Sequence, residues 1–133
     1  MIKLLIALTI LNFNLMAQTI KEEIYSCTDG NGEVVARVFF NPNVYCQEAQ
    51  KHPATLVKES RYGATVYEGE LTSDENGAIF KFERLIDNLK FIMELKLPFE
   101  MGEGQLRSIY DEDVESETNL NCIMKQIHVE CSN

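Results

Sequence analysis

The chain has 133 residues, and 21 Asp and Glu side chains against 12 Lys and Arg give it a formal net charge of −9. Nucleic acids and anionic membrane surfaces repel so acidic a protein, which excludes both as expected partners and favours a basic protein instead. The length suits a single domain with one hydrophobic core.

Residues 1–17 are typical of a secretory signal peptide. Lys3 supplies a positive charge, an apolar run covers residues 4–16, and Ala17 offers a small residue for cleavage. The run is shorter than the roughly 20 apolar residues that a membrane span needs. We therefore expect residues 1–17 to be removed and residues 18–133 to form one exported domain, periplasmic or secreted by a bacterium, with no stable membrane anchor.

The next part of the chain predicts a β-hairpin followed by a short helix. Two β-prone segments, residues 24–28 and 33–40, flank an Asp-Gly-Asn-Gly turn. The helix is expected between Asn41, which can cap it, and Pro53, which would end it. Good helix formers fill the interval between these two residues.

The rest of the chain alternates apolar and polar residues with period two. Strands are predicted at residues 55–59, 64–71, 78–83, 90–97, 106–111 and 122–131. Turn signals such as Asn76-Gly77 separate them. About eight short strands with tight links predict an all-β fold, a small antiparallel barrel or sandwich in meander order with one short helix.

Four cysteines behind an export signal predict two disulfides. A continuous last strand would hold Cys122 and Cys131 about 30 Å apart, which excludes that pair. Two pairings remain: Cys27–Cys131 with Cys46–Cys122, or Cys27–Cys122 with Cys46–Cys131. We favour the first, because it places the first and last strands side by side and closes a barrel. The sequence contains no Cys-x-x-Cys motif, so the cysteines do not indicate a redox enzyme.

Three exposed-loop candidates for recognition are Phe99, Met101 and Tyr62. Phe99 and Met101 lie in a segment bounded by Pro98 and Gly104, and Tyr62 precedes a glycine at the start of a strand. An apolar side chain held out on a loop is a plausible anchor for a protein partner. The alternative is that Phe99 and Met101 fold back and plug one end of the barrel.

The remaining polar clusters predict no catalysis. Residues 111–117 carry five carboxylates, which we expect on a solvated loop, with Ca²⁺ or a basic partner as the alternative. His52 and His128 are the two histidines, and structural roles are expected for both. No nucleophile motif occurs, so the sequence predicts neither an enzyme, a cofactor nor a metal site.

Two short segments resemble the periplasmic inhibitors of C-type lysozyme. Tyr25-Ser26-Cys27 is followed by a glycine turn and an apolar strand, and Gly63-Ala64-Thr65-Val66-Tyr67 follows later. The resemblance implies a small disulfide-bonded antiparallel barrel that inserts a loop into a basic enzyme. The family's Ser-Gly-x-x-Tyr pattern is not met, because Tyr62 stands where the serine should be. No functional residue is therefore carried over.

Three functions follow as hypotheses. The first is an exported, non-catalytic binding protein, such as an inhibitor that recognises a protein through its loops. The second is a carrier that holds a small apolar ligand inside the barrel, and the third and weakest is a hydrolase without a recognisable motif. The first two differ in the barrel interior, which would be filled if the side chains at five positions all pointed inward: Phe80, Phe82, Phe91, Met93 and Leu95.

Overall fold

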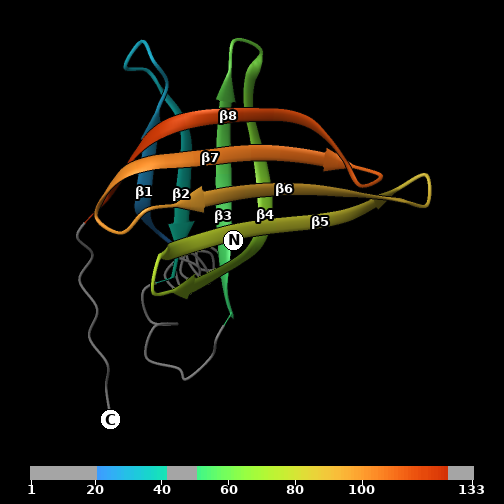
Figure 1. The fold of residues 1–133 in the computed structure, drawn as a ribbon, viewed down its shortest axis with the longest axis horizontal. Helices are drawn as coiled ribbons and strands as arrows, with labels where there is room; N and C mark the ends of the chain where they lie inside the picture. Colours follow the sequence, from blue (N-terminus) through green and yellow to red (C-terminus); the bar gives the residue numbers. More distant parts are fainter. Residues whose placement is uncertain (1–20, 42–50, 126–133) are drawn as a thin grey trace, which may run out of the picture.

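The computed structural model describes residues 21–41 and 51–125, which fold into an all-β closed antiparallel barrel (Figure 1). Each strand pairs with the next one in the chain, so the meander predicted from the tight turns is confirmed. The strands of the described residues are β1 (Glu22–Thr28), β2 (Val34–Phe40), β3 (Lys51–Ser60), β4 (Gly63–Asp74), β5 (Gly77–Ile86), β6 (Leu89–Leu97), β7 (Met101–Tyr110) and β8 (Asp113–Met124).

The barrel consists of two four-stranded layers that cross at a steep angle. In Figure 1, β1 to β4 run from top to bottom, and β5 to β8 cross in front of them. The layers join at two short ladders, one between β4 and β5 and one between β1 and β8. The expectation that the first and last strands lie side by side is therefore confirmed.

The barrel interior is packed with side chains that alternate along each strand. Among the five residues that test the interior, Phe80, Met93 and Leu95 are buried, and Phe82 and Phe91 are partly buried and pack against the same core. Other large core side chains come from the opposite layer and include Tyr25, Val38, Phe40 and Leu56. Dense packing of this kind leaves little interior space.

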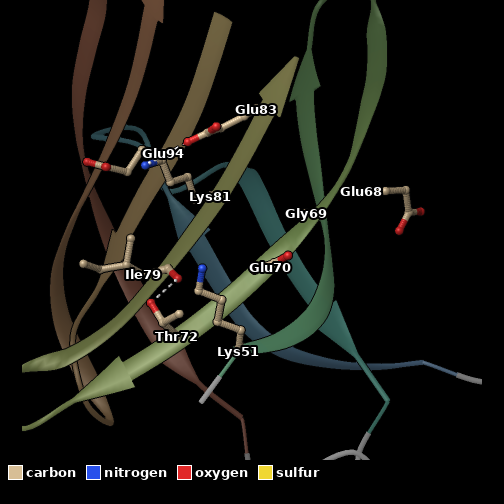
Figure 2. A pocket seen from close by; sticks show the side chains of 9 residues that line it. All are labelled: Lys51, Glu68, Gly69, Glu70, Thr72, Ile79, Lys81, Glu83 and Glu94. Atoms are coloured by element: carbon tan, nitrogen blue, oxygen red, sulfur yellow. Dashed lines mark hydrogen bonds and ion pairs between the residues drawn. The ribbon is translucent and has the colours of Figure 1, made fainter. Parts of the chain in front are cut away.

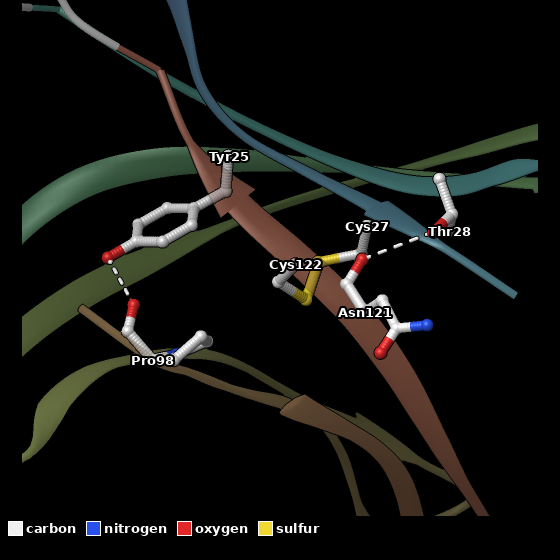
Figure 3. The surroundings of a disulfide bond; sticks show 6 residues. All are labelled: Tyr25, Cys27, Thr28, Pro98, Asn121 and Cys122. Carbon is white, nitrogen blue, oxygen red and sulfur yellow. Dashed lines mark hydrogen bonds between the residues drawn. A yellow bond between two sulfur atoms is a disulfide. The ribbon is translucent and has the colours of Figure 1, made fainter. Parts of the chain in front are cut away.

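One disulfide closes the barrel between its first and last strands. Cys27 of β1 faces Cys122 of β8 in the register, both are fully buried, and their sulfurs are bonded (Figure 3). The favoured pairing of Cys27 with Cys131 is therefore wrong. The last strand was expected nine residues too late, and its actual position sets Cys122 opposite Cys27. Cys46 and Cys131 lie outside the described residues.

The predicted helix is wrong at its C-terminal end. Residues Lys51, His52 and Pro53 begin strand β3, where His52 pairs with Leu71 of β4. Pro53 is tolerated in this strand because β2 begins to pair with β3 only at Ala54, so the missing N–H of Pro53 lies beyond that ladder. The rest of the predicted helix, residues 42–50, lies outside the described residues, as do residues 1–17 and His128.

Candidate functional site

The turn between β6 and β7 is fixed to the barrel end by hydrogen bonds from two other strands. The hydroxyl of Tyr25 donates to the Pro98 carbonyl at 3.1 Å, a contact that Figure 3 shows beside the disulfide. The Met124 amide of β8 donates to the Glu100 carbonyl at 2.6 Å, and the Met101 amide donates to the Phe99 carbonyl at 2.7 Å. These bonds fix the backbone of the turn.

Three apolar side chains are exposed at this turn or on the strands beside it: Phe99 lies in the turn, Met101 is the first residue of β7 and not part of the loop that was expected there, and Ile123 lies in β8. Met101 is 72% exposed, and it pairs in the register with Ile123 of β8, which is 52% exposed. Phe99 is 46% exposed. We call these three residues the turn platform. Ile123 was not singled out in the sequence, because the predicted last strand gave no reason to place it beside Met101.

Phe99 also borders a small pocket at the barrel end. The pocket has a volume of about 190 Å³, and its other lining residues include Tyr25, His52, Leu71 and Met124. Phe99 thus contributes both to the barrel end and to the surface, and its role as an anchor for a partner stays a prediction. Met101 does not line this pocket and stays on the surface.

Tyr62, the third candidate for recognition, lies away from the turn platform. It occupies the turn between β3 and β4 and is 90% exposed, with its amide donating to the Ser60 hydroxyl at 3.2 Å. In Figure 1 this turn is at the top of the molecule, whereas the turn between β6 and β7 is at the left. The structure therefore brings Met101 beside Ile123, with Phe99 two residues away in the adjoining turn, and it leaves Tyr62 apart.

A larger cleft lies on the outer surface where β4 and β5 diverge (Figure 2). Its volume is about 640 Å³. The lining is rich in charge, with four carboxylates and two amines: Glu68, Glu70, Glu83, Glu94, Lys51 and Lys81. The sequence analysis did not predict this cleft. The signal that could have indicated it is Gly69 inside a β-rich segment, because glycine within a strand often marks a close backbone approach.

Two carboxylates of the cleft are held in the ionised form. Hydrogen bonds from Thr55 at 2.8 Å and Lys21 at 3.0 Å lower the pKa of Glu68. The ammonium of Lys81, 3.0 Å away, lowers the pKa of Glu83. A general acid needs a raised pKa, so these two groups do not suit proton transfer, and each is already ion-paired with a lysine of this chain.

The acidic segment at residues 111–117 forms a tight turn and the start of a strand. Asp111 and Glu112 form a tight turn with positive φ angles, and residues from Asp113 onward belong to β8. The expectation of a solvated loop over residues 111–117 is wrong for most of that segment, although its side chains are exposed. Within residues 21–41 and 51–125, no group of three His, Cys, Asp or Glu side chains is arranged to hold a metal ion.

The comparisons with known proteins identified no relative of this chain. No protein-family model matches the chain, and neither curated proteins nor solved structures gave a match. The described part of the chain contains no helix with the length and apolarity to cross a membrane.

Proposed function

We propose that this chain is an exported, non-catalytic binding protein that recognises a basic protein through the turn platform. The observation that carries the proposal is the exposed pair Met101 and Ile123, neighbours on adjacent strands beside a turn that hydrogen bonds fix to the barrel. Apolar side chains on a rigid support bind with little loss of conformational entropy. Exposed apolar neighbours of this kind are characteristic of protein interaction sites.

Three further features support the proposal. The signal-like residues 1–17 and the disulfide both fit an exported protein, because disulfides persist in oxidising compartments. The net charge of −9 favours association with a basic partner. The packed interior, with Phe80 and Leu95 fully buried, favours recognition at the surface over carriage of an apolar ligand.

The first test is binding to a purified C-type lysozyme, the basic enzyme that the sequence resemblance suggests, and to proteins retained from the native periplasm. The double variant Met101→Ser/Ile123→Thr removes the apolar contacts at exposed positions. If the turn platform is the recognition site, affinity measured by calorimetry should fall by at least about tenfold, since central apolar anchors contribute about 1.4 kcal/mol or more.

The matched control is Leu85→Ser/Val114→Thr, which removes two exposed apolar side chains from the opposite end of the β5 to β8 layer. Its affinity should equal that of the wild type. Equal loss in both variants, or a lipid that co-purifies with the protein while no macromolecule is retained, would contradict the proposal. The second result would favour the carrier function.

A further inference from the structure

Three stretches of five or more residues at sheet edges have no strand partner within the described residues. The ladder between β4 and β5 stops at the pair Glu70 and Lys81, which leaves residues 63–69 of β4 and residues 82–86 of β5 unpaired on that side. The ladder between β1 and β8 covers only residues 121–124 of β8, which leaves residues 113–120 open. Figure 2 shows β4 and β5 diverging beyond the cleft. Open edges of this kind can pair with another chain.

Two of these edges carry charges that discourage such pairing. The edge of β8 carries acidic residues at alternating positions, including Glu115 and Glu117, and its pairing with β7 is irregular after Ser108. The edge of β5 carries Glu83 and Arg84. Charged side chains and bulges are the usual protection of an exposed edge.

The edge of β4 has a charged side chain at Glu68 alone. Residues 63–67 read Gly-Ala-Thr-Val-Tyr and contain neither a charged residue nor a proline. The first four of these residues are exposed, with Val66 at 56%. The β4 edge therefore carries the fewest charged residues of the three edges, and it lies beside the cleft that β4 and β5 form.

The surroundings of this edge define the side chains that an added strand would need. On the inner side, the ring of Tyr67 meets Phe82 at a centroid distance of 5.3 Å, and Phe82 meets Phe91 at 6.3 Å. On the outer side, the neighbouring residues of β4 are Glu68 and Glu70. Successive side chains of an added strand would point to these two sides in turn, toward aromatic rings and then toward carboxylates.

The charge at the outer side favours a basic strand. Three of the four carboxylates of the cleft are already paired with cations of this chain, Glu68 with Lys21, Glu83 with Lys81 and Glu94 with Arg107. The Glu70 carboxylate has no ion-pair or hydrogen-bond partner within the described residues, and the chain as a whole carries a net charge of −9, so a basic side chain beside Glu70 is the favoured contact.

We propose that residues 63–69 of β4 accept an extended segment of a partner protein, with alternating apolar and basic residues, as an added strand beside the cleft. Backbone hydrogen bonds to the open edge supply affinity, and the alternating side chains supply specificity. The open edge of β4 does not include the turn platform, so this proposal can be tested independently of the function proposed above.

The test uses a short synthetic peptide that alternates valine and lysine, added to the isotope-labelled full chain. Amide NMR shifts and slowed hydrogen exchange are expected at residues 63–69. A peptide with the same side chains but with methylated backbone nitrogens should not bind, because it cannot donate to the edge. A valine–glutamate peptide should bind at least about tenfold more weakly, a difference of about 1.4 kcal/mol.

A pair of charge-reversal variants tests the position of the site. Glu70→Lys should weaken the valine–lysine peptide by about fivefold at low salt, as expected for the loss and reversal of a surface charge contact. Glu115→Lys makes the same change at an exposed acidic position of β8 and should leave binding unaltered.

Several outcomes would overturn the proposal. They are shifts at residues 113–120 instead of 63–69, binding that survives backbone methylation, equal effects of the two variants, and no binding of the peptide. Self-association of the chain through the same edge, seen as concentration-dependent shifts at residues 63–69 without peptide, would assign the edge to a second copy and would equally refute it.

Discussion

Thr55 connects two charged side chains on the outer surface of β3 and β4. Its side chain is almost fully buried, its hydroxyl donates to Glu68 at 2.8 Å, and it accepts from the Lys21 ammonium at 2.6 Å. These contacts join positions that are 13 and 34 residues apart in the chain. The sequence could not reveal this group, because nothing in a local pattern brings Lys21 to Glu68.

We predict that Thr55→Val raises the pKa of Glu68 toward its ordinary value of 4.5, because the hydrogen bond from Thr55 is the largest cause of the lowering. A group with a lowered pKa stabilises the folded state above its ordinary pKa, and that contribution is lost as the pH falls through the folded-state value. Thr55→Val should therefore weaken the dependence of stability on pH below about 4.5. The lost hydrogen bonds should also cost about 1 kcal/mol at neutral pH.

Carboxyl NMR titration and urea unfolding at several pH values measure both effects. The control is Thr72→Val, which removes a hydroxyl that donates to the Ile79 carbonyl on the same surface. That variant should leave the titration of Glu68 unchanged. A Glu68 titration that is identical in Thr55→Val and the wild type would show that Lys21 alone lowers the pKa.

Gly69 allows β4 to approach β5 closely where their ladder ends. A β-carbon on Gly69 would lie 2.8 Å from the Phe80 ring and even closer to the Lys81 carbonyl oxygen. This close approach separates the paired part of β4 from its open edge, and Gly69 lines the cleft there. At the level of elements, a single missing side chain therefore positions both the cleft and the edge.

We predict that Gly69→Ala destabilises the protein by about 1–3 kcal/mol, because backbone and a buried ring must move to accommodate the methyl group. Urea unfolding measures the loss. Gly30→Ala is the matched control, since nothing lies within 4 Å of a β-carbon there, and it should change stability much less. Equal stability of Gly69→Ala and the wild type would mean that β4 and β5 can separate without cost.

The sequence predicted β6 well, placed the start of β7 five residues too late, and predicted the last strand poorly, for a physical reason. In β6 the apolar residues alternate clearly, and the expected and observed bounds agree within a residue at each end. In β8, Leu120 and Cys122 point to the core, while the intervening and preceding outer positions are polar or acidic. The density of charge suggested a loop, although an alternating acidic face is compatible with a strand. This error also shifted the predicted cysteine pairing.

At the scale of the whole molecule, the meander and the closed barrel were predictable, and the candidate site was predictable only in part. Tight turns between consecutive strands favour neighbour pairing, and this local signal determines most of the topology. Phe99 and Met101 could be chosen from their Pro- and Gly-bounded segment. The cleft and the open edge of β4 depend on where two ladders stop. The crossing of the two layers determines those positions, and Gly69 is the one local feature of the sequence that indicates them.

The closure of the barrel depends on a short ladder and one covalent bond. β1 and β8 share only the pairs from Tyr25 with Met124 to Thr28 with Asn121, and the disulfide joins residues 95 apart in sequence. A bridge across so long a loop removes much of the freedom of the unfolded chain, in principle about 4.7 kcal/mol for a loop of about 100 residues. The disulfide should therefore be the main stabiliser of this seam.

We predict that reduction of the Cys27–Cys122 bond lowers the free energy of unfolding by about 2–4 kcal/mol, the usual range for native disulfides. The background Cys46→Ala/Cys131→Ala isolates this bond, because Cys27 and Cys122 are then the two cysteines left. Urea unfolding of this variant with and without reductant gives the contribution directly, and peptide mapping of the oxidised form verifies the bond. A control that also carries Cys27→Ala and Cys122→Ala should not respond to reductant. If reduction leaves the unfolding midpoint unchanged, the four-residue ladder and the packed interior close the barrel by themselves, and the bond contributes nothing to the seam.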